Sequence, residues 1–286
     1  MKIKFIINPI SGTGKQKGIE KDISKYFNNY QIEYTKQKGD ATRISYDAVK
    51  NNFSTVIAIG GDGTVNECLK SLINTNVVLG VIPCGSGNGF AYHIGMNSDT
   101  KKAIKQLKKT SIETIDLGSV NKIPFINVSG IGFDAHIAQL FDKSKRRGLA
   151  NYIMLILKEL NYQPQEYNIQ YDGISSNITA YMISFANSSQ YGNNIKIAPM
   201  ANIKDGLLDF VIIKTMPKWK IPLLLMKIVT GKIQLSKYVE IIKCKKMKIK
   251  AKNTQVHLDG EPYTTSNPIT INLKQNSLKI MIPNEK

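Results

Sequence analysis

The chain has 286 residues, of which 42% are hydrophobic and 21% are charged, a composition that excludes an intrinsically disordered protein. Its net charge of +18, from 39 basic against 21 acidic residues, favours anionic partners such as nucleotides, nucleic acid or membrane surfaces. A lysine-favouring codon bias would produce the same excess. The net charge therefore favours anionic partners as a class but does not identify one.

Cysteine and histidine usage argues against a zinc site and a disulfide framework. Cys68, Cys84 and Cys244 are scattered and form no CxxC pair, and the three histidines are dispersed. We interpret Cys84, beside a glycine loop, as a packed thiol. No apolar stretch is long enough to span a bilayer, and the short run before Asn8 resembles a first strand more than a signal peptide. These features predict a cytoplasmic protein.

The first hundred or so residues alternate between strand-like and helix-like patterns. Apolar runs at 3–7, 55–59 and 77–82 alternate with polar stretches of helical spacing near 14–29, 41–50 and 64–73. Such alternation predicts a parallel sheet with helices on both faces, and ligands bind such sheets where strands end. We predict an α/β nucleotide-binding domain over residues 1–118.

From about residue 115 onward, short β-like runs predominate. They lie at 125–129, 177–186, 209–213, 240–243, 247–252, 255–258 and 268–273, with helical segments near 148–160 and 222–230. This pattern predicts a mostly antiparallel β-sandwich or distorted barrel over residues 119–286, whose last few residues return to the first domain. The expected fold class is α/β plus β.

The first glycine loop follows the first strand. Residues 8–15 read Asn-Pro-Ile-Ser-Gly-Thr-Gly-Lys and open a helix, but Pro9 and Gln16 depart from the Walker A pattern. Small residues before a helix would let backbone N–H groups approach a phosphate. A tight turn without a ligand is an equally good interpretation of this loop taken alone.

The second glycine loop carries the strongest signal. Residues 60–67 read Gly-Gly-Asp-Gly-Thr-Val-Asn-Glu, directly after a strand. The glycines permit the close backbone approach that a polyphosphate needs. Asp62 would repel that ligand unless a divalent cation lay between them or the carboxylate faced an acceptor hydroxyl, as phosphoryl transfer requires. A structural turn aspartate is the weaker alternative.

A third glycine loop ends the next strand. Residues 83–89 read Pro-Cys-Gly-Ser-Gly-Asn-Gly. One such segment is weak evidence, but three loops after successive strands of one sheet predict a nucleotide-sized site.

Acidic residues of the second half supply candidate chemistry. Asp259 and Glu261 flank Gly260 and can converge on one site, one binding metal and the other accepting a proton. An exposed β-turn fits the spacing equally well. The segment 202–207 is either a turn entering a strand or a small oxygen-ligand metal site.

Taken in order, these motifs resemble the diacylglycerol kinase catalytic family, specifically the bacterial soluble lipid kinases related to sphingosine and ceramide kinases. The resemblance covers essentially the whole chain and includes Gly-Ile-Gly-Phe-Asp at 130–134 and Asp-Gly-Leu-Leu-Asp at 205–209. It implies ATP bound in a cleft between an α/β domain and a β-sandwich.

The resemblance also implies roles for individual residues. Nucleotide contacts would fall on Asn8, Pro9, Ile10, Ser11, Gly12, Thr35, Gly60, Gly61, Asp62, Gly63, Thr64, Asn66 and Ser86. Glu261 would match the proton acceptor, beside Asp259 and with Asp62 as a third catalytic carboxylate. Asp134 and Asn88 would contact the substrate. Asp205, with Asn202 and Leu207, would match a structural magnesium site.

One segment departs from the family pattern. Many bacterial diacylglycerol kinases continue the third loop with Asn-Asp-Phe-x-Arg, whereas residues 88–92 here read Asn-Gly-Phe-Ala-Tyr. Gly89 and Tyr92 thus replace an acid and an arginine. The Gly-Ser-Gly-Asn spelling is closer to the sphingosine and ceramide branch, so the acceptor lipid stays open.

Two segments bear on membrane contact. Residues 218–229 join lysines and a tryptophan to a dense apolar run, which suits an interfacial segment. A helix that covers one end of the β domain is the favoured interpretation. Another apolar helix follows the basic residues Lys143, Lys145, Arg146 and Arg147, and Lys248, Lys250 and Lys252 line one face of a strand. No aromatic-interleaved basic surface supports nucleic-acid binding.

We therefore predict an ATP- and Mg²⁺-dependent kinase that phosphorylates a lipid hydroxyl, acting from the cytoplasm with transient contact at the anionic inner face of the membrane. A homodimer is compatible with the sequence. An NAD kinase shares the Gly-Gly-Asp-Gly-Thr loop and is the nearest alternative enzyme. A catalytically inactive lipid-binding or regulatory protein is the alternative from a different class.

Overall fold

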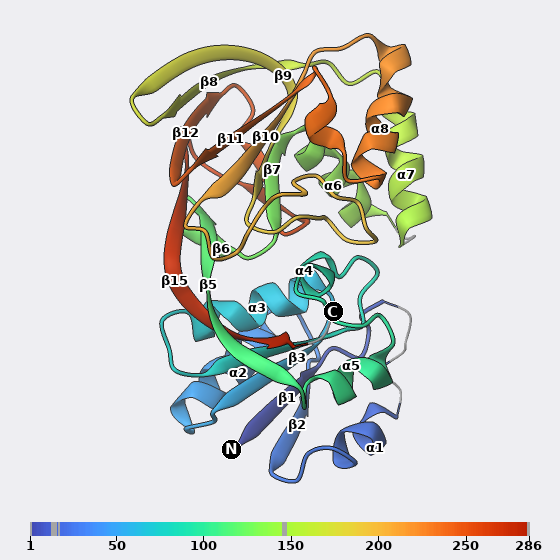
Figure 1. The fold of residues 1–286 in the computed structure, drawn as a ribbon, viewed down its shortest axis with the longest axis vertical. Coiled ribbons are helices and arrows are strands. Elements are labelled where there is room, and N and C mark those ends of the chain that lie inside the picture. The colour runs from blue at the N-terminus through green and yellow to red at the C-terminus, as the bar shows by residue number, and fades with distance from the viewer. Residues whose placement is uncertain (1, 13–15, 17, 145–147, 285–286) are drawn as a thin grey trace. The chain divides into compact units, whose positions relative to one another are not determined.

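The computed structural model describes residues 2–12, 16, 18–144 and 148–284. The chain forms two compact units, one of residues Met1–Ile115 and Asn276–Lys286, the other of Asp116–Gln275. It passes from one unit to the other within two long strands, β5 (Thr110–Val120) and β15 (Ile269–Pro283) (Figure 1).

The first unit is built on parallel strands. In order across the sheet these are β4 (Val78–Pro83), β3 (Thr55–Gly60), β1 (Ile3–Ile7) and β2 (Tyr30–Tyr34), with the last part of β15 parallel beside β4. Every residue of β3 and β4 is buried, as expected for a parallel sheet covered on both faces. This confirms the predicted α/β architecture.

Helices connect these strands. They are α1 (Ile19–Ser24), α2 (Asp40–Lys50), α3 (Asp62–Leu72), α4 (Gly89–His93) and α5 (Thr100–Gln106). α2 buries Ala41, Ile44 and Ala48 on one face, which is the spacing that its amphipathic pattern predicts. α5 begins at Asp99, whose side chain accepts the Lys102 N–H at 2.9 Å.

The second unit consists mainly of antiparallel strands, as predicted. They are β6 (Ile123–Phe125), β7 (Val128–Gly132), β8 (Gln165–Tyr171), β9 (Ile174–Ala186), β10 (Leu208–Lys214), β11 (Val239–Cys244), β12 (Lys246–Ala251), β13 (Gln255–Leu258) and β14 (Glu261–Thr264). Their neighbours run in the order β14-β13-β7-β9-β8-β12-β15, with β10 pairing β9 and β11. Lys248 and Lys250 are exposed on β12 while Met247 and Ile249 are buried, so the predicted basic face is confirmed.

One predicted run, 125–129, is divided between β6 and β7. The N–H groups of Ile126 and Asn127 donate to the carboxylate of Asp259 at 3.0 and 2.8 Å. A side chain from 132 residues or more farther along the chain thus takes the place of a strand partner. A local pattern cannot show such a bond.

The described part of the second unit also contains the α-helices α6 (Phe133–Lys143), α7 (Leu149–Lys158) and α8 (Ile221–Val229). α8 buries Leu224 and Ile228 in a core cluster with Val211 and Ile213 of β10. The covering-helix interpretation of 218–229 is therefore confirmed for this face. Within the part of the chain that the structure describes, no helix has the length and apolar content needed to cross a membrane.

The three cysteines are buried and take part in no disulfide. Burial raises the pKa of Cys68 to about 12 and that of Cys244 to about 11, so neither forms a thiolate at neutral pH. We expect no reaction of these two thiols with Ellman's reagent in the native protein, and full reaction after denaturation. Spectrophotometric thiol titration measures this. Fast labelling of Cys68 in the native state would show that α3 opens locally.

Candidate active site

The glycine loops lie at one edge of the parallel sheet. Ile7 of β1 is opposite Ile59 of β3, and Gly60 of β3 is opposite Pro83 of β4. Because these strands are parallel and in register, the loops after β1, β3 and β4 leave the sheet at the same level. The structure thus brings together the three loops that the sequence predicts to converge.

Backbone contacts between the loops require glycine. A Cβ atom on Gly12 would lie 2.0 Å from the carbonyl oxygen of Cys84, and one on Gly85 would lie 2.4 Å from the Cα of Gly61. Gly12 also has a φ of +62°. Main chains packed this closely place peptide groups, rather than side chains, at the surface of the loops, as a phosphate-binding site needs.

Polar side chains fix the first loop. Asn8 donates from Nδ2 to Oγ1 of Thr64 at 3.2 Å, which links this loop to the start of α3. The Nε2 group of Gln16 donates to the carbonyls of Asn8, Pro9 and Ser11 at 3.1, 2.6 and 3.2 Å. Gln16, noted in the sequence only as a departure from Walker A, therefore holds the loop. The predicted glycine-lysine pair at 14–15 lies outside the described residues.

Asp62 ties the second loop to the third. Its carboxylate oxygens accept the N–H groups of Gly89 and Phe90, each at 3.2 Å. These amides begin α4, so the carboxylate also faces the positive end of a short helix. Asp62 thus has a structural role in addition to the predicted catalytic one, which stays a prediction.

Asn88 shapes the third loop from within. Its Oδ1 accepts the Gly85 N–H at 2.8 Å, and its Nδ2 donates to the Gly85 carbonyl at 2.7 Å and to the Tyr92 hydroxyl at 3.2 Å. Tyr92, one of the two departures from the family pattern, therefore supports the loop. The predicted substrate contact of Asn88 stays a prediction, whereas Ser86 of the same loop is exposed.

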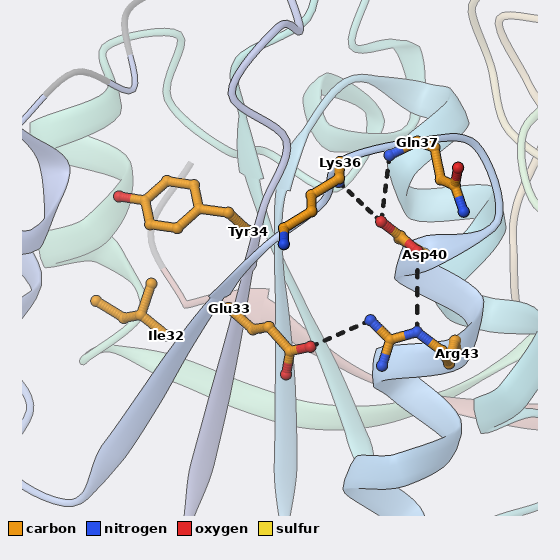
Figure 2. Close-up of a pocket in the computed structure, with 7 residues that line it drawn as sticks. All are labelled: Ile32, Glu33, Tyr34, Lys36, Gln37, Asp40 and Arg43. Carbon is orange, nitrogen blue, oxygen red and sulfur yellow. Dashed lines mark hydrogen bonds and ion pairs between the residues drawn. The ribbon is translucent and has the colours of Figure 1, made fainter.

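A pocket of about 560 Å³ lies beside Thr35, another predicted nucleotide contact (Figure 2). Its lining comes from β2, the loop after it and α2: Ile32, Glu33, Tyr34, Lys36, Gln37, Asp40 and Arg43. Arg43 pairs with Glu33 at 3.3 Å and Asp40 at 3.8 Å. None of the lining residues belongs to the glycine loops, and Thr35 itself is buried with its N–H bonded to the Ile7 carbonyl at 2.9 Å.

In the second unit, Asp259 and Gly260 form the two-residue turn of the β13–β14 hairpin. Both have positive φ, +50° and +89°, as a type I′ turn requires. Asp259 is buried and accepts the two N–H groups at the β6–β7 break, whereas Glu261 is partly exposed at the start of β14. Asp259 therefore holds the hairpin in place, whereas the proton-accepting role of Glu261 stays a prediction.

A buried polar cluster lies beside this hairpin. Oδ2 of Asp134 accepts from the hydroxyls of Tyr191 at 2.6 Å and Ser184 at 3.1 Å, and lies 2.8 Å from Nε2 of His257 without a well-directed hydrogen bond. Nδ1 of His257 accepts the Gly260 N–H at 3.1 Å. Burial, with the negative charge of Asp134, raises the pKa of Tyr191 well above its usual value, so its hydroxyl stays protonated.

This cluster bears on the predicted role of Asp134. Its side chain is buried and bonded within the protein, and a Cβ on Gly130 would lie 2.4 Å from its Oδ2. Glycine at 130 is thus needed for the carboxylate to fit. The head-group contact of Asp134 stays a prediction.

A lysine of β11, Lys243, lies against the candidate metal loop 202–207. Oδ1 of Asp205 accepts the Leu207 N–H at 3.1 Å, Asn202 accepts the Lys204 N–H at 3.0 Å, and Oδ2 of Asp205 lies 3.3 Å from Nζ of Lys243. Carboxylate and carbonyl oxygens suit Mg²⁺, so the donors fit in kind. Lys243 already supplies positive charge there. Among the described residues, no three His, Cys, Asp or Glu side chains are grouped to hold a metal.

Lys243 also pairs with Asp209, a buried carboxylate 3.2 Å away. Burial raises the pKa of Asp209, and Lys243 opposes this effect. We expect Lys243→Met to lower the free energy of unfolding by about 2 kcal/mol at about pH 7, because it leaves the buried carboxylate of Asp209 without this cation. Solvent screening of the partly exposed lysine keeps the loss below that of a fully buried pair. Guanidinium unfolding measures the change.

The pH dependence checks the cause. A carboxyl whose folded pKa is raised takes up a proton in the folded state first, so the folded state gains stability as pH falls through that pKa. The loss in Lys243→Met should therefore shrink between about pH 7 and about pH 5. Lys245→Met, which removes an exposed lysine, is the matched control. An equal loss at both pH values would mean that Asp209 is not the group concerned.

Family models match both halves of the chain. Residues 2–120 match the diacylglycerol kinase catalytic domain, and residues 127–282 match the YegS C-terminal NAD kinase beta sandwich-like domain. The chain belongs to the diacylglycerol kinase and YegS family. The resemblance stated from the motifs is confirmed, and membership makes the protein one of a family of lipid kinases.

Individual relatives agree with this assignment. A diacylglycerol kinase of Bacillus subtilis is 28% identical over 99% of this chain and 97% of its own. A YegS-like probable lipid kinase of Chromohalobacter salexigens is 29% identical over 81% of this chain and 77% of its own. The crystal structure of a candidate diacylglycerol kinase from Bacillus anthracis has a TM-score of 0.84 and 26% identity, covering 99% and 97% of the two chains.

Sequence reasoning missed several residues that build this lipid kinase fold. Tyr191, Ser184 and His257 belong to no motif that predicts chemistry, and they meet at Asp134, which is distant in the sequence. The partners of Gln16 are near it in the sequence, but glutamine at that position matches no known loop pattern. One signal was available: His257 lies two residues before Asp259, in the strand whose turn carries the acidic pair. The predicted basic run 143–147 includes residues 145–147, which lie outside the described residues.

Proposed function

We propose that the protein is an ATP-dependent lipid kinase that transfers the γ-phosphate to the hydroxyl of a diacylglycerol-, sphingosine- or ceramide-like lipid. The observation that carries the proposal is the packing of three glycine loops, main chain against main chain, at the carboxyl edge of the parallel sheet. In a member of a lipid kinase family, that cradle supports a polyphosphate as the ligand.

In this proposal the glycine loops bind the nucleotide and the β13–β14 hairpin supplies the base. Backbone N–H groups of the glycine loops bind the triphosphate, and Asn8 and Thr64 hold the loop geometry. Glu261 accepts the proton of the lipid hydroxyl. The hydroxyl oxygen of the lipid bonds to the γ-phosphorus of ATP as the bond between the γ-phosphorus and the β-phosphate oxygen breaks. ADP leaves as the anion. Asp259 keeps Glu261 in place through its two backbone hydrogen bonds.

Magnesium would enter with the nucleotide. Asp62 is the carboxylate among the glycine loops that would help to hold this ion. When bound, the ion would supply positive charge beside the β- and γ-phosphates. Asp62 also keeps the second loop against the third. We place the enzyme in the cytoplasm, with transient contact at the inner face of the membrane where its acceptor resides.

The test is transfer of label from [γ-³²P]ATP to a total-lipid extract of the source organism, followed by identification of the labelled lipid. We expect one major labelled lipid that requires Mg²⁺. A parallel reaction with NAD as acceptor tests the other kinase class, since the C-terminal half matches a domain described as NAD kinase-like. Labelled NADP with no labelled lipid would overturn the proposal, and tight lipid binding without any transfer would indicate a non-catalytic protein.

A further inference from the structure

The helix α8 and the turn before it expose a row of large apolar side chains. Trp219, Leu223, Met226 and Val229 are 72, 44, 58 and 62% exposed and recur every three or four residues, so they form one stripe along the helix. The buried residues of α8 lie on its other face. This outer stripe is therefore not needed to attach the helix to the core.

The helix α7 carries a second exposed stripe. Ile153 and Leu157 of α7 and Leu160, in the turn just after it, are exposed at spacings of four and three residues. Nζ of Lys218, just before α8, donates to Oδ1 of Asn161, just after α7, at 2.6 Å. The two helices are drawn next to each other at one side of the second unit (Figure 1), and this bond joins their ends. We call the two stripes together the α7–α8 face.

The charge around this face has one sign along α8. Residues 215–239 contain five lysines, at 218, 220, 227, 232 and 237, and no aspartate or glutamate. Nζ of Lys220 lies 3.9 Å from the centre of the Trp219 ring. Lysines beside an exposed tryptophan and an apolar stripe can bind lipid phosphates while the apolar groups enter the acyl boundary.

We propose that the α7–α8 face binds the surface of an anionic lipid bilayer. This inference rests on the proposed function to the extent that a lipid acceptor resides in a bilayer, but the binding itself needs neither nucleotide nor catalysis. A second copy of the chain is a poorer occupant. A two-fold interface on this face would oppose lysine with lysine along α8, where residues 215–239 offer no acid to pair with them.

Trp219 reports on the binding directly, because it is the single tryptophan of the 286-residue chain. We expect its fluorescence to shift to shorter wavelength on addition of phosphatidylglycerol–phosphatidylcholine vesicles without ATP, and to be quenched when the lipids carry brominated acyl chains. Vesicles of phosphatidylcholine alone should bind more weakly, and salt should weaken binding to the anionic vesicles. An unchanged spectrum with anionic vesicles would overturn the proposal.

Paired variants locate the surface. The double variant Leu223→Ser/Met226→Ser should lower vesicle partitioning about tenfold or more. Ile174→Ser removes a side chain that is 51% exposed elsewhere on the same unit, in β9, and should leave partitioning unchanged. Lys220→Glu/Lys232→Glu should weaken binding to anionic vesicles, while the same charge change at Lys248 and Lys250 of β12 should weaken it much less.

Two outcomes would overturn the assignment: equal loss in the stripe variant and in Ile174→Ser, or a wild-type dimer that the stripe variant converts to monomer with vesicle binding unchanged. Sedimentation velocity measures the second. The proposed kinase activity is measured in a separate assay. Vesicle binding without phosphorylation of any lipid would reject the proposed function and retain this face, whereas transfer to a micelle-dispersed short-chain lipid without vesicle binding would do the reverse.

Discussion

Glu261→Gln is expected to lower kcat for phosphate transfer about a thousandfold while leaving the protein folded, because a positioned general base contributes on the order of 10²–10⁴ in rate. Glu261 is partly exposed at the start of β14. The glutamine keeps its shape but cannot take the proton. Initial rates with the acceptor lipid that the labelling experiment identifies, together with the thermal unfolding curve, measure both effects.

Asp259→Ala, in contrast, should lower the stability of the fold. Its carboxylate accepts two N–H groups at the break between β6 and β7, and both lie in a buried region. Removing the acceptor leaves two buried donors without it, so we expect the free energy of unfolding to fall by about 3 kcal/mol. Near-wild-type turnover in Glu261→Gln, or unchanged stability in Asp259→Ala, would show that the roles assigned to the two carboxylates are wrong.

Gly85→Ala is expected to weaken ATP binding tenfold or more and to lower the free energy of unfolding by about 2 kcal/mol. The added Cβ would lie 2.4 Å from the Cα of Gly61, and this contact between two main chains has no flexible group that can move aside. The second and third loops must therefore separate. Isothermal titration with a non-hydrolysable ATP analogue measures the binding.

Gly173→Ala separates crowding from backbone strain. Gly173 has a φ of +80°, but a Cβ there would meet no atom within 4 Å. The variant should cost about 1 kcal/mol of stability through strain alone, without affecting nucleotide affinity. If Gly85→Ala bound the analogue as tightly as wild type, the packed loops would not be the nucleotide cradle.

Much of the candidate site could be predicted because its residues lie in short contiguous segments of the sequence. The loops at 60–67 and 83–89 and the turn at 259–260 each need particular residues at adjacent positions, since positive φ and close backbone approach restrict the choice to glycine or a few others. Strand ends that precede such loops then indicate where they gather. Alternation of strands and helices in the first half likewise sufficed for the parallel sheet.

The roles of the two carboxylates in the second half could not be predicted in this way. Spacing alone lets Asp259 and Glu261 exchange roles, and the difference comes from the backbone amides of Ile126 and Asn127. The sequence likewise did not show that Tyr191, Ser184 and His257 surround Asp134, whose contact with the substrate stays a prediction. Burial and hydrogen-bond partners depend on residues fifty or more positions away, which no local pattern records.

By itself, the sequence determined the fold class, the family motifs and the edge of the sheet where the glycine loops meet, because local backbone preference and periodicity carry that information. The tertiary structure alone decided which polar groups are hydrogen-bonded within the protein and which apolar side chains stay outside the core. In α8 the sequence shows one dense apolar run, but packing on β10 buries Leu224 and Ile228 and leaves Leu223 and Met226 exposed. Burial results from contacts distant in the chain, so it appears only once the chain has folded.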